Sequence, residues 1–435
     1  MSERRGFLRR MTAATALGEG LDGYDLGVIS VVLPIASTQL GMTTVEEGLL
    51  GASSLAGIFF GAPLFGYLTD RLGRRKIFIF DLIAFVILGA AQIAVQEVVL
   101  LLVLRFALGL AIGAEYAIGQ PMLAEFSPTK GRGRRLASLQ TSWYGGFLLA
   151  VVVGYALDAI GVDWRVILAT GAIPAILTLM LRHGLPESPR WLASQGRTEE
   201  AKTIVEENLG GEHYEEEGFE AEENSAGDGA SFARLFDRDT WRSTAFASIF
   251  FTCAVGPYFA IFTFAPEVFS SLGLEGAKVS IIATNAIAFI GALAGMFVIA
   301  KVGRRKLLLT CFWVMLVTIT VIGFFPSGAV ALLLACLVGF AFFNAIAGDL
   351  TGVYPAEVFS SEIRATGVGF AAAMSRVGAA GGTFLLPVGI AGIGIGPSFL
   401  IAAAMVAVGL GVTLWLAPET SEMSLSQAED AVATG

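Results

Sequence analysis

Long apolar stretches separated by polar connections run through almost the whole chain. A helix needs about 20 apolar residues to cross the hydrocarbon core of a bilayer. Windows of that length give twelve candidate spans, near residues 14–37, 48–69, 77–96, 98–122, 136–157, 164–183, 242–265, 279–300, 307–325, 329–352, 364–387 and 392–417. Most connections are short, so neighbouring helices are expected to be antiparallel. The pattern predicts an all-α integral membrane protein embedded in a lipid bilayer.

The polar stretch 184–241 interrupts this pattern and divides the spans into two groups of six. We expect an N-terminal six-helix bundle over residues 14–183 and a C-terminal six-helix bundle over residues 242–417. Residues 184–241 are then a cytoplasmic central loop, and residues 1–13 and 418–435 are the two tails.

Positively charged residues gather in the N-terminal tail, the central loop and every second connection, whereas the other connections carry only Arg165 and Lys278. Positively charged connections stay on the cytoplasmic side of a membrane. We therefore place both termini in the cytoplasm, and the excess of Arg over Lys favours a bacterial plasma membrane. The Arg4-Arg5 pair resembles an export signal, but Asp22 in the apolar stretch that follows argues against one.

Composition narrows the range of functions. Hydrophobic residues make up 55% of the chain and charged residues 15%, whereas soluble domains carry roughly 25% charged residues. The two His leave little for a metal site, and three Cys in apolar stretches imply no disulfide framework. We recognise no Ser/His/Asp set and no phosphate-binding loop, so we expect neither an enzyme nor a cofactor. The acidic segment 206–228 is typical of a solvated linker, and we expect a monomer without a nucleic-acid partner.

Two sequence motifs occur twice. Residues 61–76 read GAPLFGYLTDRLGRRK and residues 291–306 read GALAGMFVIAKVGRRK, each at the predicted cytoplasmic end of the second span of its half. Residues 124–126 (AEF) and 356–358 (AEV) form a second pair, at the end of the fourth span of each half. Two pairs in matching register indicate a parallel duplication. Transporters with parallel repeats rock their two bundles around a central binding site.

The segment from Gly66 to Lys76 resembles the signature loop of the major facilitator superfamily. Other segments resemble its sugar-porter and metabolite-symporter branches, namely 23–25 (GYD), 186–192 (PESPRWL), 356–364 and 418–420 (PET). The resemblance covers the whole chain. It implies a secondary transporter that moves a small-molecule substrate by alternating access, is driven by the proton gradient and uses no cofactor. Residues 22–25 (DGYD) also resemble the first-span motif of aromatic-acid and related metabolite:proton symporters.

Charged residues of the repeated motifs can pair at the cytoplasmic ends of the helices. Such pairs would hold an inner gate shut when the protein opens outward and would break when it opens inward. Each exposed pair contributes about 0–1 kcal/mol, so a network is needed. In the alternative interpretation, the positive charges only fix the topology. The candidate gate residues are Asp70, Arg74, Arg75, Glu125 and Arg132 in the first half and Arg304, Arg305, Glu357 and Arg364 in the second.

An acid and a base lie at matching depth in the first half. Helical rise places Asp25 roughly 16 Å and Arg105 roughly 20 Å from the inner edge of the bilayer. In proton-coupled sugar porters the corresponding Asp is taken to carry the coupling proton, and the corresponding Arg to modulate it. The resemblance therefore implies these roles for Asp25 and Arg105. A permanent structural ion pair is the alternative.

Further acids lie within the first half. Glu19, Asp22 and Asp25 follow at a spacing of three and share one broad helix face. This face should point into the bundle, because a carboxylate is costly in lipid. Glu115, at about the depth of Glu19, can share a proton with it or line a wet inner vestibule. Asp22 and Glu115 are therefore further candidates for proton coupling.

Arg376 lies in the middle of the eleventh span and needs a counter-charge, either a substrate anion or Asp349. Gln140 aligns with a Gln that contacts sugar in sugar porters, but the chain lacks their Gln pair in the seventh span and their Trp in the tenth. These departures weaken a sugar assignment, and the mixture of possible lining residues suits a small organic acid. We expect its symport with protons, with a sugar or polyol porter or an uncoupled facilitator as alternatives. The fifth span lacks the Gly-Pro-rich pattern of antiporters, which disfavours efflux. The candidate cavity residues are Gln140, Trp143, Tyr144, Tyr258, Asn285, Asn344 and Arg376, although ordinary packing is an alternative for each aromatic one.

Overall fold

The computed structural model describes residues 2–127, 132–208, 232–238, 240–274, 277–299, 301–359 and 363–420. Throughout these ranges the regular elements are helices. The first half holds α1 (Ser2–Leu40), α2 (Thr44–Leu72), α3 (Arg74–Ala91), η1 (Gln92–Ala94), α4 (Val98–Phe126), α5 (Arg132–Ala159), α6 (Trp164–Ala169) and α7 (Ala172–Arg182). The middle segment holds α8 (Pro189–Ser194), α9 (Thr198–Asn208) and η2 (Phe232–Phe236). The second half holds α12 (Trp241–Thr263), α13 (Ala265–Ser271), α14 (Ala277–Val298), α15 (Arg304–Phe324), α16 (Val330–Val358), α17 (Arg364–Ile393) and α18 (Ile395–Leu416).

Within the described ranges, 12 helical segments are long and apolar enough to cross a membrane. α6 and α7 together form the sixth of them, Trp164–Arg182. Large apolar side chains such as Phe60, Val103, Met180 and Trp415 point outward from these segments. Such a surface would be costly in water, but the hydrocarbon of a bilayer solvates it. The prediction of a twelve-span, all-α membrane protein is confirmed.

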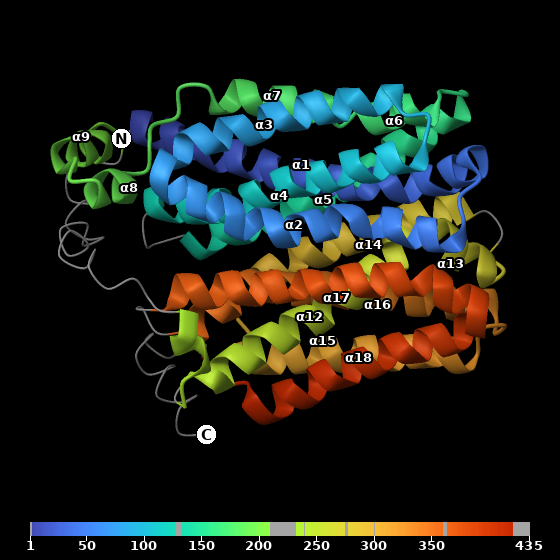
Figure 1. Cartoon of the computed structure of the whole chain (residues 1–435). Helices are drawn as coiled ribbons and strands as arrows, with labels where there is room; N and C mark the ends of the chain where they lie inside the picture. The colour runs from blue at the N-terminus through green and yellow to red at the C-terminus, as the bar shows by residue number, and fades with distance from the viewer. Residues whose placement is uncertain are drawn as a thin grey trace.

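The spans form two bundles, seen in Figure 1 as a blue-to-green half above a yellow-to-red half. Across the plane between them, α2 packs against α17, and α5 packs against α14 and α16. Glycines of α2 allow the bundles to meet closely. A Cβ on Gly48 would lie 2.6 Å from the carbonyl oxygen of Phe384, and one on Gly51 would lie 3.1 Å from the ring of Phe264.

Both bundles present their chain ends to one side. α1 begins and α18 ends at the left of Figure 1, where α8 and α9 also lie. We call this side the α8–α9 end and the other side the opposite end. The loops that lead from α1 to α2 and from α17 to α18 lie at the opposite end. The start of α2, with its close contacts to α17, therefore also lies there.

The turn between α2 and α3 depends on a glycine. Gly73 has a φ of +96°, a conformation that residues with a Cβ rarely adopt. Its N–H donates to the Thr69 carbonyl (3.0 Å) and thereby ends α2, and α3 starts at the next residue. In the second copy of this motif, Gly303 has a φ of −56°. The two copies therefore share their sequence pattern without sharing this backbone turn.

Two segments differ from the expectation for connecting regions. α1 begins at Ser2, so residues 2–13, which belong to the expected tail 1–13, form the start of the first helix. The physical reason is burial, because Leu8 and Met11 pack into an apolar cluster with Phe126. The middle stretch 184–241, expected as a loop, contains α8 and α9, and most of its acidic segment lies outside the described residues. Ser188 caps α8 by accepting a hydrogen bond from the Trp191 N–H (3.1 Å).

Candidate functional site

An ion pair between α1 and α4 lies inside the first bundle. Arg105 Nη1 donates to Asp25 Oδ1 at 2.8 Å, and Arg105 Nη2 donates to the Asp25 carbonyl at 3.0 Å. The two side chains are 1% and 4% exposed. Removing one partner from such a buried pair typically costs about 3–5 kcal/mol, because it leaves the other charge uncompensated. The pairing expected from matching depth is confirmed, and its role in proton transfer stays a prediction.

A second group of buried charges lies among α3, α4 and α7. Arg182 pairs with Glu115 through Nη2 and approaches Asp81 Oδ2 with Nη1 at 3.6 Å. Nη1 also donates to the Phe78 carbonyl at 3.0 Å. The three charged side chains are at most 1% exposed. Glu115 is therefore buried and paired with Arg182 in this conformation.

Sequence reasoning missed Asp81 and Arg182. Asp81 lies in the third apolar span, and a charged residue in such a span is a functional candidate by default. That signal could have identified it. Arg182 is the last residue of α7, where a positive charge normally marks the membrane edge.

Glu19 and Asp22 lie on the same side of α1 as these charges. Gln120 Nε2 donates to Glu19 Oε1 at 3.5 Å, and Glu19 is 1% exposed. Both carboxyl oxygens of Asp22 are buried and have no hydrogen-bond partner among the described residues. Glu115, Asp81 and Arg182 lie within electrostatic range of Asp22. The acids predicted to face into the bundle do so.

Arg376 lies at the plane between the bundles. Its guanidinium carbon is 4.8 Å from the ring centroid of Tyr116 in α4 and 5.9 Å from that of Phe259 in α12. Within the described part of the chain it makes no hydrogen bond or ion pair, and it is 8% exposed. The alternative partner Asp349 does not contact it. Asp349 lies against Gly295 of α14 instead, with both carboxyl oxygens buried and without a hydrogen-bond partner in that part.

Aromatic residues from both bundles meet near this plane. The ring of Tyr258 in α12 is 6.1 Å from Trp143 and 5.6 Å from Tyr144, both in α5. Tyr144 Oη donates to Asn344 Oδ1 in α16 at 3.4 Å. These four predicted cavity residues are all at most 4% exposed. They therefore form a packed contact between the bundles in this conformation rather than the wall of an open cavity.

The two remaining predicted cavity residues, Asn285 and Gln140, also carry polar groups. Asn285 Nδ2 donates to the Ile281 carbonyl at 2.9 Å, while its Oδ1 is buried and unpartnered among the described residues. The Tyr258 hydroxyl is likewise buried and unpartnered there. Gln140 is partly exposed. Tyr258 thus offers a neutral hydrogen-bonding group close to Arg376, because the ring centroid of the adjacent Phe259 lies 5.9 Å from the Arg376 guanidinium carbon.

Contacts between the bundles are polar as well as apolar at the opposite end. Lys278 Nζ in α14 pairs with Asp158 Oδ2 in α5 at 2.7 Å. Glu267 of α13 and Glu47 of α2 repel each other across the same plane. Burial first, and the Glu47 charge second, raise the pKa of the Glu267 carboxyl above its usual value. Together with the close approach at Gly48 and Gly51, these contacts bring the bundles together at this end.

The ionic contacts given for described residues at the α8–α9 end lie within one bundle or the other. In the first, Glu125 pairs with Arg74 and accepts from Ser188 Oγ at 2.5 Å, and Glu187 accepts from the Arg75 N–H at 3.0 Å. In the second, Glu357 accepts from Arg304 Nη2 at 3.1 Å and from Thr420 Oγ1 at 2.5 Å. Arg305 donates to the Leu414 carbonyl at 2.8 Å. The side chains of Asp70, Arg132 and Arg364 lie outside the described residues.

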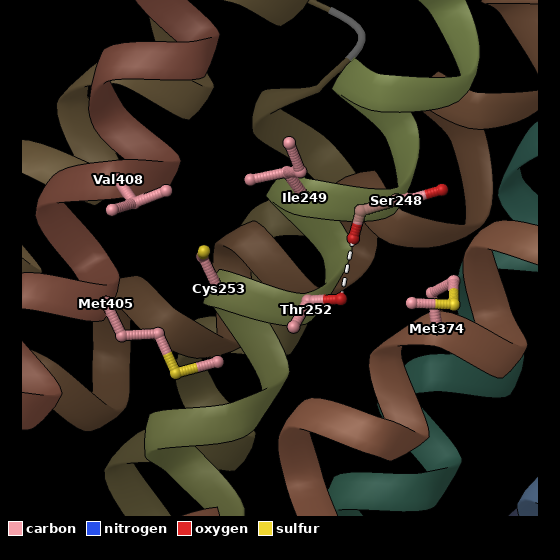
Figure 2. A pocket seen from close by; sticks show the side chains of 7 residues that line it. All are labelled: Ser248, Ile249, Thr252, Cys253, Met374, Met405 and Val408. Atoms are coloured by element: carbon pink, nitrogen blue, oxygen red, sulfur yellow. Dashed lines mark hydrogen bonds between the residues drawn. The ribbon is translucent and has the colours of Figure 1, made fainter.

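Figure 2 shows a pocket of about 320 Å³ inside the second bundle. Its lining is mostly apolar and comes from α12, α17 and α18. Val408, one of its lining residues, is 54% exposed on the outer surface. The lining carries no charged residue, so this pocket is not the candidate site. It is lined by Ser248, Ile249, Thr252, Cys253, Met374, Met405 and Val408.

Known proteins resemble this chain over nearly its full length. A family model described as "Sugar (and other) transporter" matches residues 11–431. The inner membrane metabolite transport protein YgcS of Escherichia coli (strain K12) is 37% identical over 417 residues, which cover 96% of this chain and 92% of that protein.

Solved structures of XylE share the fold. The MFS (major facilitator superfamily) proton:xylose symporter XylE bound to 6-bromo-6-deoxy-D-glucose superimposes with a TM-score of 0.80 at 23% identity, over 98% of this chain and 99% of that one. The partially occluded inward-open conformation of XylE from E. coli gives a TM-score of 0.82 at 22% identity, over 96% of this chain and 100% of that one.

Proposed function

The chain belongs to the sugar (and other) transporter family of the major facilitator superfamily, and on this basis we propose that it is a proton-coupled symporter for a small organic anion. That it is a membrane transporter and not an enzyme follows from the family itself. The proposal adds the class of substrate, the coupling ion and the orientation in the membrane.

Arg376 is the observation that carries the anion proposal. A guanidinium is always charged, and burying it without a counter-charge is costly. Arg376 makes no ion pair or hydrogen bond with an acid among the described residues, and Glu19 lies only within electrostatic range of it, although its side chain is largely buried between the bundles. A carboxylate from a substrate would complete the site, because guanidinium and carboxylate form strong bidentate hydrogen bonds. The rings of Tyr116 and Phe259 would flank such a ligand.

The Asp25–Arg105 pair supports proton coupling. Asp25 is a carboxylate that can gain a proton and then release Arg105, which changes the packing of α1 against α4. XylE, which shares the fold, is described as a proton:xylose symporter. In an uncoupled facilitator this carboxylate would serve only as the structural partner of Arg105, at a depth where burial is costly.

The orientation rests on the distribution of positive charge. With the α8–α9 end in the cytoplasm, both termini are cytoplasmic and the opposite end faces outward. The contacts of Lys278 with Asp158, and of Gly48 and Gly51 with α17, then close the outer side. The structure corresponds in this orientation to an inward-facing or occluded state of the alternating-access cycle.

A ligand screen tests the substrate class. Purified full-length protein is heated with organic acids, sugars and polyols, and the shift of its unfolding temperature is measured. We expect organic acids to raise the unfolding temperature, since a ligand that binds only the folded state stabilises it. Arg376→Gln should abolish this shift. Arg197→Gln, which removes the same charge from the exposed start of α9, should preserve it.

A separate observation favours the alternative substrate class, a sugar or polyol. The Tyr258 hydroxyl and Asn285 Oδ1 are unpartnered neutral groups of the kind that bind sugar hydroxyls. A sugar or polyol that shifts the unfolding temperature equally in the parent protein and in Arg376→Gln would favour a sugar or polyol porter. It would also reject the anion proposal.

A further inference from the structure

The first bundle contains a second buried charge cluster that the Asp25–Arg105 pair does not use. We infer that Asp22, Asp81 and Glu115, arranged around Arg182, form a second proton-binding site. Its occupation by protons follows from the structure alone, whereas its use during transport rests on the proposed proton coupling. The site lies between α1, α3, α4 and α7, nearer the α8–α9 end than Asp25.

The geometry of the cluster is built around one guanidinium. Arg182 pairs with Glu115, lies 3.6 Å from Asp81 and stacks on the Phe78 ring with its guanidinium carbon 3.3 Å from the centroid. α1 can approach this pair because residue 18 is a glycine. A Cβ at Gly18 would collide with both Arg182 and Glu115.

The charges in the cluster do not balance. Three carboxyl groups face one guanidinium, so full ionisation would leave an excess of two negative charges in a dry interior. Unpaired buried charges are strongly disfavoured, and neighbouring carboxyl groups instead retain protons. The cluster is neutral when two carboxyl groups are protonated. Glu115 makes the direct contact with Arg182, so these two side chains form the ion pair of the cluster.

Asp22 is the clearest holder of a proton. Its side chain is fully buried, neither of its oxygens has a hydrogen-bond partner among the described residues, and it makes no ion pair there. Asp81 accepts one hydrogen bond, from the Leu82 N–H at 2.7 Å, and lies beside Glu115. A proton on Asp81 can therefore be shared with the Glu115 carboxylate.

The surroundings connect this cluster to the plane between the bundles. Glu19 from α1 and Tyr116 from α4 lie in electrostatic range of the cluster, and Arg376 from α17 lies in range of these two groups. Glu19 lies in range of both Glu115 and Arg376. An anion bound at Arg376 would weaken the attraction of Glu19 to that arginine, and this change would favour a proton on Glu19. Glu19 thus links the cluster electrostatically to the region of Arg376 without involving Asp25.

Infrared spectroscopy tests the site without any substrate. The C=O stretching band of protonated carboxyl groups is recorded from purified full-length protein as the pH is raised from acidic to alkaline. We expect bands from buried carboxyl groups to persist at neutral pH. Asp22→Asn should remove one of them, while Glu206→Gln, which changes an exposed acid of α9, should leave the spectrum unchanged.

A second variant, Arg182→Met, should change the intensity of the carboxyl band in the opposite direction. Arg182→Met removes the cation around which the described carboxyl groups of the cluster are arranged, so one more carboxyl group loses its counter-charge and the carboxyl band should grow. An unchanged neutral-pH spectrum in both Asp22→Asn and Arg182→Met would overturn the inference. The outcome is separate from that of the proposed function, because loss of uphill transport in Asp25→Asn bears on coupling and not on this band.

Discussion

Only one of the two carboxyl oxygens of Asp25 accepts a hydrogen bond from Arg105. Oδ1 accepts the hydrogen bond from Arg105, and Oδ2 is buried with no partner among the described residues. A proton can therefore arrive at Oδ2 before the hydrogen bond at Oδ1 breaks. Once the carboxyl group is neutral, the charge that holds Arg105 is gone.

The first prediction concerns this residue. Asp25→Asn keeps the shape of the side chain but can neither gain nor lose a proton. We expect uphill uptake of the substrate into proteoliposomes under an imposed pH gradient to fall to background. Exchange of internal for external substrate should continue, because it needs no net proton movement.

Glu206→Gln is the matched control, since it neutralises an exposed acid that contacts none of these groups. Uphill uptake that survives in Asp25→Asn would show that the pair is structural. If a protonophore does not change uptake by the parent protein, the protein is instead a facilitator.

Residue positions differ in how far sequence alone can place them. Asp25 and Arg105 can be paired from the sequence because depth along two helices is known from counting residues. The partners of Arg182 cannot be found in this way, because they depend on how α3, α4 and α7 pack around each other. Arg376 is intermediate, since its need for a counter-charge can be predicted but the absence of contact with Asp349 cannot.

Hydropathy predicts the membrane-spanning elements well because each must match the thickness of a bilayer. The shorter helices α8 and α9 lie outside the reach of a 20-residue window, since α8 covers Pro189–Ser194 and α9 covers Thr198–Asn208. The break between α6 and α7 is equally local. There the Thr170 and Tyr24 hydroxyl groups form a hydrogen bond at 2.7 Å. No periodic pattern in the sequence predicts this contact.

The α2–α3 turn supports a prediction at this scale. Gly73→Ala forces a residue with a Cβ into a left-handed conformation, at a cost of about 1–2 kcal/mol. The new Cβ would also lie 2.5 Å from Glu187 Oε2, which must move. We expect a lower unfolding temperature in detergent, measured by tryptophan fluorescence.

Gly66→Ala is the control for that substitution. Gly66 lies within α2, and a Cβ there would meet nothing nearer than the Ala117 side chain at 4.0 Å. Alanine is the better helix former, so this variant should be as stable as the parent or more so. Equal unfolding temperatures for Gly73→Ala and the parent would contradict the role assigned to the turn.

At the opposite end, few polar contacts among the described residues hold the two bundles together. Lys278→Met removes the pair with Asp158, which as an exposed contact contributes about 0–1 kcal/mol. A change of about 1 kcal/mol alters the ratio of two states by about fivefold. We expect a larger population with the bundles apart at this end.

Distances between spin labels at Val45→Cys in α2 and Val279→Cys in α14 would measure that population. Both positions are exposed and lie at the opposite end. Lys301→Met, at the α8–α9 end, should leave the distances as they are. A distance distribution that does not lengthen in Lys278→Met would refute the assignment of this pair as an outer latch.

Glu267 adds a pH dependence to the same equilibrium. Its pKa is raised by burial and by Glu47 when the bundles meet, and it returns toward its ordinary value when they part. A protonated Glu267 therefore favours the closed arrangement at low pH, and this preference is lost as the pH rises through the raised pKa. With the same labels, we expect the closed population to decrease with rising pH in the parent protein. Glu267→Gln should stay closed over that range, and an identical pH response in both would contradict the role of Glu267.

The buried charges of the first bundle also constrain how the protein is made. Asp81 enters the membrane on the third span, whereas its cation Arg182 follows only at the end of the sixth. A charged side chain at the centre of a newly inserted helix costs about 2.5–3.5 kcal/mol. The third span should therefore leave the translocon with Asp81 protonated, or remain beside it until the sixth span arrives. Nascent chains cut before Arg182 should then be held at the insertion machinery and degraded, while an Asp81→Asn chain of the same length should partition into lipid.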